Sequence, residues 1–260
     1  MSHILAICGR ELRSLFATPT AYVLFAAYVL IGGFFFTSSL RFFLEQVEQV
    51  QAIPQYAQYL ELFANLNLRV INPALGTFVI LFIIVIPFLT MRAFSEERAN
   101  GTIELLLTSP VTTWEIVLGK YLAVLFWVGL FVLAAGAFSS LLFVYGNPEV
   151  PWTLASHLGL FLLGAALAAM GCFVSSLTRS PIIAGVVGLI ASLLLYMFGL
   201  LAGAIENPAL AEPVRYLSLQ THVDSSFVGL VRLQDLVYFA VLITLFLTLA
   251  RTALESLRWR

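Results

Sequence analysis

The 260-residue chain is 61% hydrophobic and only 10% charged, and its mean hydropathy is +0.99. This composition excludes a soluble globular domain, in which about 25% of residues are charged. The net charge of −1 indicates no particular class of partner, and we expect no nucleic acid among its partners. The apolar residues form long unbroken runs, whereas an outer-membrane barrel shows alternating segments of about ten residues.

Six stretches free of Asp, Glu, Lys and Arg follow one another along the chain, and five exceed the ~20 residues that a helix needs to cross the hydrocarbon core. The sixth is shorter, but Arg251 after it can snorkel to the interface. We therefore expect an all-α integral membrane protein with one transmembrane domain over residues 1–260. The expected membrane helices are 21–40, 73–98, 113–145, 153–177, 181–204 and 236–254.

The segment 1–18 is expected to form an interfacial amphipathic helix before the first membrane helix. Its apolar residues recur at helical spacing and share one face, while its charged residues lie elsewhere. Thr18-Pro19-Thr20 then changes the direction of the chain. A simple surface anchor and a functional element explain this helix equally well. The apolar face comprises Leu5, Cys8, Leu12, Leu15 and Phe16.

Two longer connecting regions, 41–72 and 205–235, are expected on the outer side of the membrane. Both mix acidic residues with aromatic and aliphatic ones. Such amphipathic composition favours short helices packed near the outer interface over disorder.

A charged hairpin, residues 92–110, separates the second and third membrane helices. Charges are costly near a bilayer, so this cluster marks a surface exposed to water. The second membrane helix is expected to extend to Arg98. Asn100-Gly101 after it is expected to end the helix with a residue in the left-handed conformation.

A short transverse helix over 103–107 is expected inside this hairpin. Thr102 can cap it, and Glu104 suits the positive N-terminal end of its dipole. Ser109-Pro110 ends it. Thr112-Thr113-Trp114-Glu115 then forms a capping box that starts the third membrane helix.

The distribution of Lys and Arg predicts the orientation. With the N-terminus inside, nine of these cations lie on the cytoplasmic side and four on the outer side, which places both termini in the cytoplasm. The inner set is Arg10, Arg13, Arg92, Arg98, Lys120, Arg179, Arg251, Arg258 and Arg260, and the outer set is Arg41, Arg69, Arg215 and Arg232.

The fourth membrane helix and the start of the fifth are rich in small residues, which let helices approach closely. Packing within the chain is the favoured interpretation, and a dimer face is the alternative. The small residues are Gly164, Ala165, Ala168, Ala169, Gly171, Ser175, Ala184, Gly185 and Gly188.

The sequence shows no catalytic or nucleotide-binding pattern. It contains no G-x-x-x-x-G-K-[ST] phosphate loop, and no Ser/His/Asp arrangement is evident. His222, with Asp224 two residues later, is the best candidate for a metal ligand, but a hydrogen bond within the loop explains it better. We expect no metal site and no enzymatic activity. The membrane helices are nearly free of ionisable groups, which argues against a proton- or sodium-coupled carrier.

Three motifs resemble the permease subunits of ABC-2 type ABC transporters, most closely the gliding-motility type and its relative in nitrous oxide reductase maturation. The most specific motif is residues 94–111 (FSEERANGTIELLLTSPV) followed by 114–120 (WEIVLGK). The second is 216–230 (YLSLQTHVDSSFVGL) ahead of 235–239 (DLVYF), and the third is 254–260 (LESLRWR). The resemblance covers essentially the whole chain.

This resemblance implies a six-span half-transporter in the bacterial cytoplasmic (inner) membrane, usually an exporter. It further implies an N-terminal connecting helix, a coupling helix between spans 2 and 3, and re-entrant helices between spans 5 and 6. Two such permeases pair and dock two cytoplasmic ATPase subunits, which hold the ATP and magnesium, so that this chain has no cofactor of its own. The implied ATPase-coupling residues are Glu96, Glu97, Arg98, Gly101, Thr102 and Glu104, with Arg10 and Arg13 as possible secondary contacts.

A different class of function fits the same resemblance. The chain could be a membrane scaffold that transmits ATPase-driven force to an auxiliary protein on the outer side, without moving a solute. In that case 41–72 and 205–235 would carry the function. The second permease is either an identical copy or a similar subunit.

Overall fold

The computed structural model describes residues 2–52, 65–103 and 110–257, and these described residues contain helices but no strand. In chain order the helices are α1 (Ser2–Ala17), α2 (Pro19–Ala52), the π-helix η2 (Asn67–Ile71), α4 (Asn72–Thr90), α5 (Ser95–Ala99), α7 (Thr113–Tyr145), α8 (Val150–Leu177), α9 (Pro181–Gly203), α10 (Pro208–Tyr216), α11 (Leu219–Phe227) and α12 (Leu233–Ser256).

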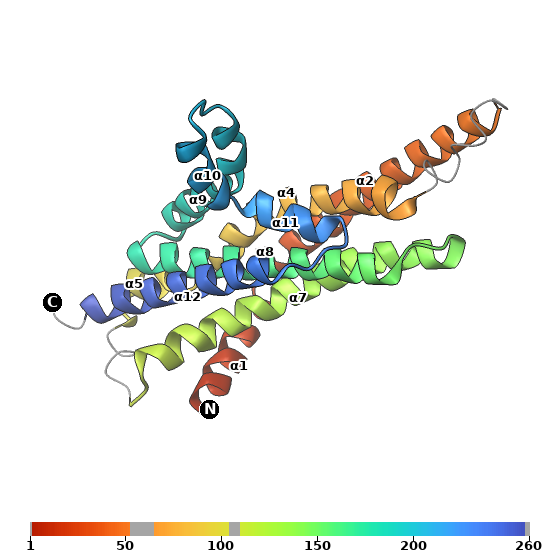
Figure 1. The fold of residues 1–260 in the computed structure, drawn as a ribbon. Coiled ribbons are helices and arrows are strands. Elements are labelled where there is room, and N and C mark those ends of the chain that lie inside the picture. The colour runs from red at the N-terminus through yellow and green to blue at the C-terminus, as the bar shows by residue number, and fades with distance from the viewer. Residues whose placement is uncertain (1, 53–64, 104–109, 258–260) are drawn as a thin grey trace.

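Six helical segments of the described chain are long and apolar enough to cross a membrane, which confirms the predicted all-α membrane architecture. They are based on α2, on η2 with α4 and α5, and on α7, α8, α9 and α12. Both chain ends, α5 and the start of α7 lie at one end of the bundle (Figure 1). We call this the hairpin end, because the described part of the hairpin, residues 92–103 and 110, is located there.

The first membrane helix is longer than predicted. The apolar run stops at Leu40, but α2 continues to Ala52 and so includes the first part of the predicted outer region 41–72. No Gly or Pro interrupts residues 41–52, so nothing in the backbone ends the helix there. At 1.5 Å per residue its 34 residues span about 51 Å, well beyond a ~30 Å hydrocarbon core.

The second membrane span is interrupted where a continuous helix was predicted. A continuous helix was expected over 73–98, but α4 ends at Thr90, and a turn over 91–94 leads into α5. The amide of Ala93 donates to the carbonyl of Thr90 in a tight turn. The next two amides, of Phe94 and Ser95, donate to a side chain of α8 rather than to their own helix. The Ser175 hydroxyl of α8 therefore replaces the helical acceptors at this point, and the helix is interrupted there.

The core is built around α8, which packs against α4, α7, α9, α11 and α12. Its glycines are points of close approach. A Cβ placed on Gly164 would lie 2.6 Å from Val128 Cγ1, and one on Gly171 would lie 2.1 Å from Thr90 Oγ1. The small residues of α8 therefore serve helix packing within the chain, as the sequence favoured. By contrast, α2, α9 and α12 expose long apolar faces that suit contact with lipid or with another membrane protein.

The N-terminal helix packs on the chain itself. α1 lies along the start of α7 so closely that a Cβ on Gly119 would meet Ile7 Cγ2 at 2.7 Å. The predicted apolar face is correct only in part. Leu12 and Leu15 pack against the core, whereas Leu5 and Phe16 are exposed. The predicted short outer helices are present as α10 and α11 in the region 205–235.

Candidate functional site

The junction between α4 and α5 is fastened to the end of α8 by one hydroxyl group. Ser175 Oγ accepts the amides of Phe94 and Ser95 at 3.0 and 3.1 Å and donates to the carbonyl of Met91 at 3.0 Å. Ser175 is completely buried, so these bonds form away from water. The turn over 91–94 is therefore held in place by α8.

A second contact fastens the other end of α5 to the same helix. The guanidinium of Arg98 donates to the backbone carbonyl of Ser176, close to the C-terminus of α8. A cation there also suits the negative end of the helix dipole. Both ends of α5 are therefore attached to α8.

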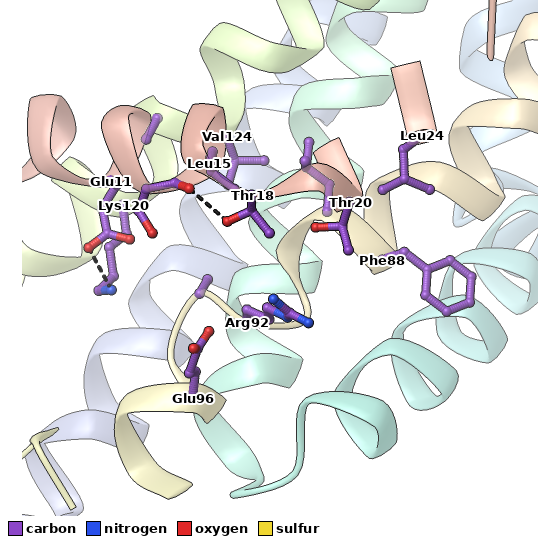
Figure 2. A pocket seen from close by; sticks show the side chains of 14 residues that line it. Glu11, Leu15, Thr18, Thr20, Leu24, Phe88, Arg92, Glu96, Lys120 and Val124 are labelled. Atoms are coloured by element: carbon purple, nitrogen blue, oxygen red, sulfur yellow. Dashed lines mark hydrogen bonds and ion pairs between the residues drawn. The ribbon is translucent and has the colours of Figure 1, made fainter. Parts of the chain in front are cut away.

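An ionic cluster joins α5 to two further helices. Lys120 Nζ, on α7, lies 2.9 Å from Glu97 Oε1 on α5 and 3.0 Å from Glu11 Oε1 on α1. Arg10, also on α1, reaches the same two carboxylates at 3.3 and 2.7 Å. Two cations thus balance two anions across three helices. Figure 2 shows the contact between Glu11 and Lys120.

The members of the ionic cluster differ in exposure. The Lys120 side chain is only 3% exposed and its Nζ lies 5.4 Å above the ring of Phe94, whereas Arg10 is 55% exposed. The hydrogen bond to Glu11 raises the pKa of Arg10 above its usual value. A buried amine costs several kcal/mol to desolvate unless it is paired, so the two carboxylates are what keep Lys120 at this position.

The predicted stop after the second helix is confirmed. Gly101 has φ +72°, the left-handed conformation that glycine adopts without strain. The amide of Thr102 donates to the carbonyl of Glu97 at 3.0 Å, closing a Schellman-type end of α5. The short helix over 103–107, Glu104 included, is mostly outside the described residues and stays a prediction.

The capping box at the start of α7 is also confirmed. Thr112 Oγ1 accepts the amide of Glu115 at 3.3 Å, and Glu115 Oε2 accepts the amide of Thr112 at 2.8 Å. This reciprocal pair fixes where the second arm of the hairpin enters the bundle.

The predicted coupling residues fall into two groups. Glu97, Arg98 and Arg10 bind other parts of this chain, whereas Glu96, Gly101, Thr102 and Arg13 are exposed. Sequence reasoning did not select Lys120 or Ser175. Lys120 is the only lysine in the chain and directly precedes an apolar run, a signal that could have identified it.

A second polar cluster lies at the opposite end of the bundle. His222 Nδ1 is 2.7 Å from Asp235 Oδ1, and its Nε2 is 2.9 Å from the carbonyl of Tyr216. Ser225 Oγ lies 2.5 Å from Asp235 Oδ2, and the imidazole stacks on Tyr238 with centroids 3.8 Å apart. The partner of His222 is therefore Asp235, and not its close sequence neighbour.

The sequence suggested no Ser/His/Asp arrangement, yet the fold brings these three residue types together at this cluster. Their order does not suit nucleophilic catalysis. Ser225 contacts the carboxylate rather than the imidazole, and a backbone carbonyl takes the second imidazole nitrogen. Among the described residues, the cluster instead ties α11 to α12 beneath α10.

The fold and the hairpin define a multi-pass, all-helical membrane protein with a polar hairpin between its second and third spans. The chain belongs to the ABC-2 family of transporter proteins, whose model matches residues 44–253. It is also similar to the inner membrane transport permease YhhJ of Escherichia coli K12 and of Shigella flexneri. Each is 32% identical over 147 residues, which is 55% of this chain and 37% of the relative. The aligned part thus spans little more than a third of those relatives.

Proposed function

We propose that this chain is the permease subunit of an ATP-binding-cassette exporter in the bacterial inner membrane, driven by a separate cytoplasmic ATPase through the hairpin 92–110. The observation that carries this proposal is that α5 is fastened to α8, α7 and α1 at once. Force applied to the exposed part of such a hairpin reaches the membrane helices without first being absorbed by a flexible loop. The family and the permease relatives support the same function.

We propose the following mechanism, which these contacts support. ATP binding closes the ATPase pair and displaces the hairpin, with Glu96, Gly101, Thr102 and Glu104 as the contact surface. The displacement passes to α8 through Arg98 and to α7 through Glu97 and Lys120. These spans then tilt as rigid bodies, and the transport path opens to the other side of the membrane. Arg10, and with it α1, is displaced together with Glu97, because the two side chains form an ion pair. In this proposal ATP and magnesium are held by the partner, both termini lie in the cytoplasm, and a second permease copy completes the path.

Co-purification from membranes of the native host tests this assignment. A tagged chain should retain a phosphate-loop ATPase, and charge reversal Glu96→Lys combined with Thr102→Lys should abolish that retention. Both positions are exposed, so the variant should fold. Glu206→Lys, an exposed site beyond α9 at the other end of the bundle, is the control and should retain the ATPase. Equal retention by all three proteins would refute the hairpin as the docking surface.

One observation favours the alternative of a scaffold that drives an outer-side auxiliary protein. α2 contains 34 residues, about 50 Å, and extends past the other helices at the end away from the termini (Figure 1). Such a protrusion offers a surface outside the bilayer. Stable capture of one membrane protein by this end, with no substrate that stimulates ATP hydrolysis, would favour the scaffold over the exporter.

A further inference from the structure

A pocket at the hairpin end shares Glu11 and Lys120 with the ionic cluster (Figure 2). Its walls are the bend between α1 and α2, the end of α4 with the turn after it, the start of α5 and the first turns of α7. The cavity itself has a volume of ≈ 70 Å³ and opens to the surface. Of its four charged lining residues, Glu11 and Lys120 satisfy each other.

The other two charges, Arg92 and Glu96, are free to bind something else. Both side chains are exposed at the pocket, and neither forms a side-chain hydrogen bond or ion pair with another described residue. They are four residues apart in sequence, but the turn over 91–94 separates them, so they do not share a helical face. The pocket thus presents one unpaired guanidinium and one unpaired carboxylate.

The polarity of the pocket changes along the membrane direction. On α4 and the turn after it, Arg92 is followed one turn deeper by Phe88. On α2, Thr20 is followed one turn deeper by Leu24. Leu89 and Val124 complete the apolar floor. Two separate helices therefore show the same order, from polar at the hairpin end to apolar toward the bundle, which is the order of a phospholipid from headgroup to acyl chain.

We propose that this pocket binds the headgroup of a phosphoethanolamine lipid from the leaflet on the hairpin side. Arg92 suits the phosphate, because a guanidinium donates paired hydrogen bonds to phosphate oxygens. Glu96 suits the primary ammonium, whose N–H groups it can accept. Soluble phosphoethanolamine offers the same two groups, but the apolar floor selects the lipid. This inference does not rest on the proposed transport function, but the two share Glu96, so the ATPase and the headgroup would compete for that carboxylate; the test below therefore uses the chain without the ATPase.

Native mass spectrometry of the purified full-length chain tests the site, with phosphatidylethanolamine, phosphatidylcholine and phosphatidylglycerol of identical acyl chains. We expect phosphatidylethanolamine to bind about fivefold more tightly than the other two, because its ammonium donates charge-assisted hydrogen bonds to Glu96, whereas choline has no N–H donor and glycerol offers only neutral hydroxyls. Arg92→Ala should weaken all three by about tenfold, through loss of the phosphate contact. Glu96→Gln should reduce phosphatidylethanolamine to the level of phosphatidylcholine and leave the latter unchanged.

Arg179→Ala is the matched control, because Arg179 is an exposed arginine at the same end that does not line the pocket. It should bind all three lipids as the unmodified chain does. An equal loss in Arg92→Ala and Arg179→Ala would overturn the proposal in favour of non-specific surface attraction. Equal binding of the three lipids would overturn it as well, and so would full competition by soluble phosphoethanolamine.

Discussion

Lys120 and Glu97 meet where α7 passes α5, with Nζ 2.9 Å from Oε1. The same ammonium is 3.0 Å from Glu11, so one buried amine joins the N-terminal helix, the hairpin and the third membrane span. Removing it leaves two carboxylates facing each other with only the exposed Arg10 between them. The hairpin is therefore attached to the bundle by a contact whose loss can be measured.

Lys120→Met should lower the free energy of unfolding by about 2 kcal/mol. This is less than the 3–5 kcal/mol typical of a fully buried pair, because the carboxylates are about one-fifth exposed. Thermal unfolding in detergent, followed by tryptophan fluorescence, measures the change. Arg10→Ala is the control and should cost less than about 1 kcal/mol, since that partner is largely exposed. If Lys120→Met and Arg10→Ala lowered the free energy of unfolding equally, the burial of the Lys120 amine would not be the cause of the loss.

Ser175→Ala should destabilise the protein by about 1–3 kcal/mol, because the buried amides of Phe94 and Ser95 lose their acceptor. Hydrogen exchange of these two amides should accelerate. Ser176→Ala provides the comparison, since the Ser176 hydroxyl bonds only within its own helix and its carbonyl still accepts from Arg98. Unchanged exchange at both amides in Ser175→Ala would contradict the proposed attachment to α8.

Gly171→Ala should impair folding, because the new Cβ would lie 2.1 Å from Thr90 Oγ1 and 2.8 Å from Thr90 Cβ. We expect a loss of about 1–3 kcal/mol, typical of overpacking. Gly76→Ala, within α4, has nothing within 4 Å and should be neutral or stabilising by up to about 1 kcal/mol through helix propensity. Melting temperatures that move together would argue against close contact between α4 and α8.

Asp235→Asn should loosen the polar cluster of His222, Ser225 and Asp235. The amide cannot accept from both His222 and Ser225 as the carboxylate does, and we expect a loss of about 2–4 kcal/mol. Asp224→Asn is the control, because that side chain is exposed, and it should leave the unfolding midpoint unchanged. If both variants had the same unfolding midpoint, the pairing of His222 with Asp235 would contribute nothing measurable to stability.

Local signals in the sequence were sufficient for much of the fold. The apolar runs indicated six membrane helices, Gly101 indicated the left-handed stop, and Thr112 with Glu115 indicated the capping box. Each of these depends on neighbours within a few residues, or on composition over one helix. Such signals do not require knowledge of which helices pack together.

The remaining features depend on contacts between distant residues. Nothing near Thr90 predicts the end of α4, because the group that interrupts the helix is Ser175, more than eighty residues away. In the sequence Glu97 has the character of an exposed charge, but in the fold Lys120 of α7 lies beside it. His222 and Asp224 looked like neighbours, but residues two apart do not face each other on a helix. The fold brings Asp235 to that position instead.

The transmission of force through the hairpin is tested most directly by a distance measured at the other end of the bundle. Spin labels at Leu44 on α2 and Val144 on α7, both exposed, would report their separation in the complex with the ATPase, with and without magnesium ATP. We predict that ATP changes this distance in the unmodified chain. In Lys120→Met combined with Ser175→Ala, the ATPase should still bind but the ATP-dependent change should be lost. An identical change in that variant would contradict coupling through these contacts.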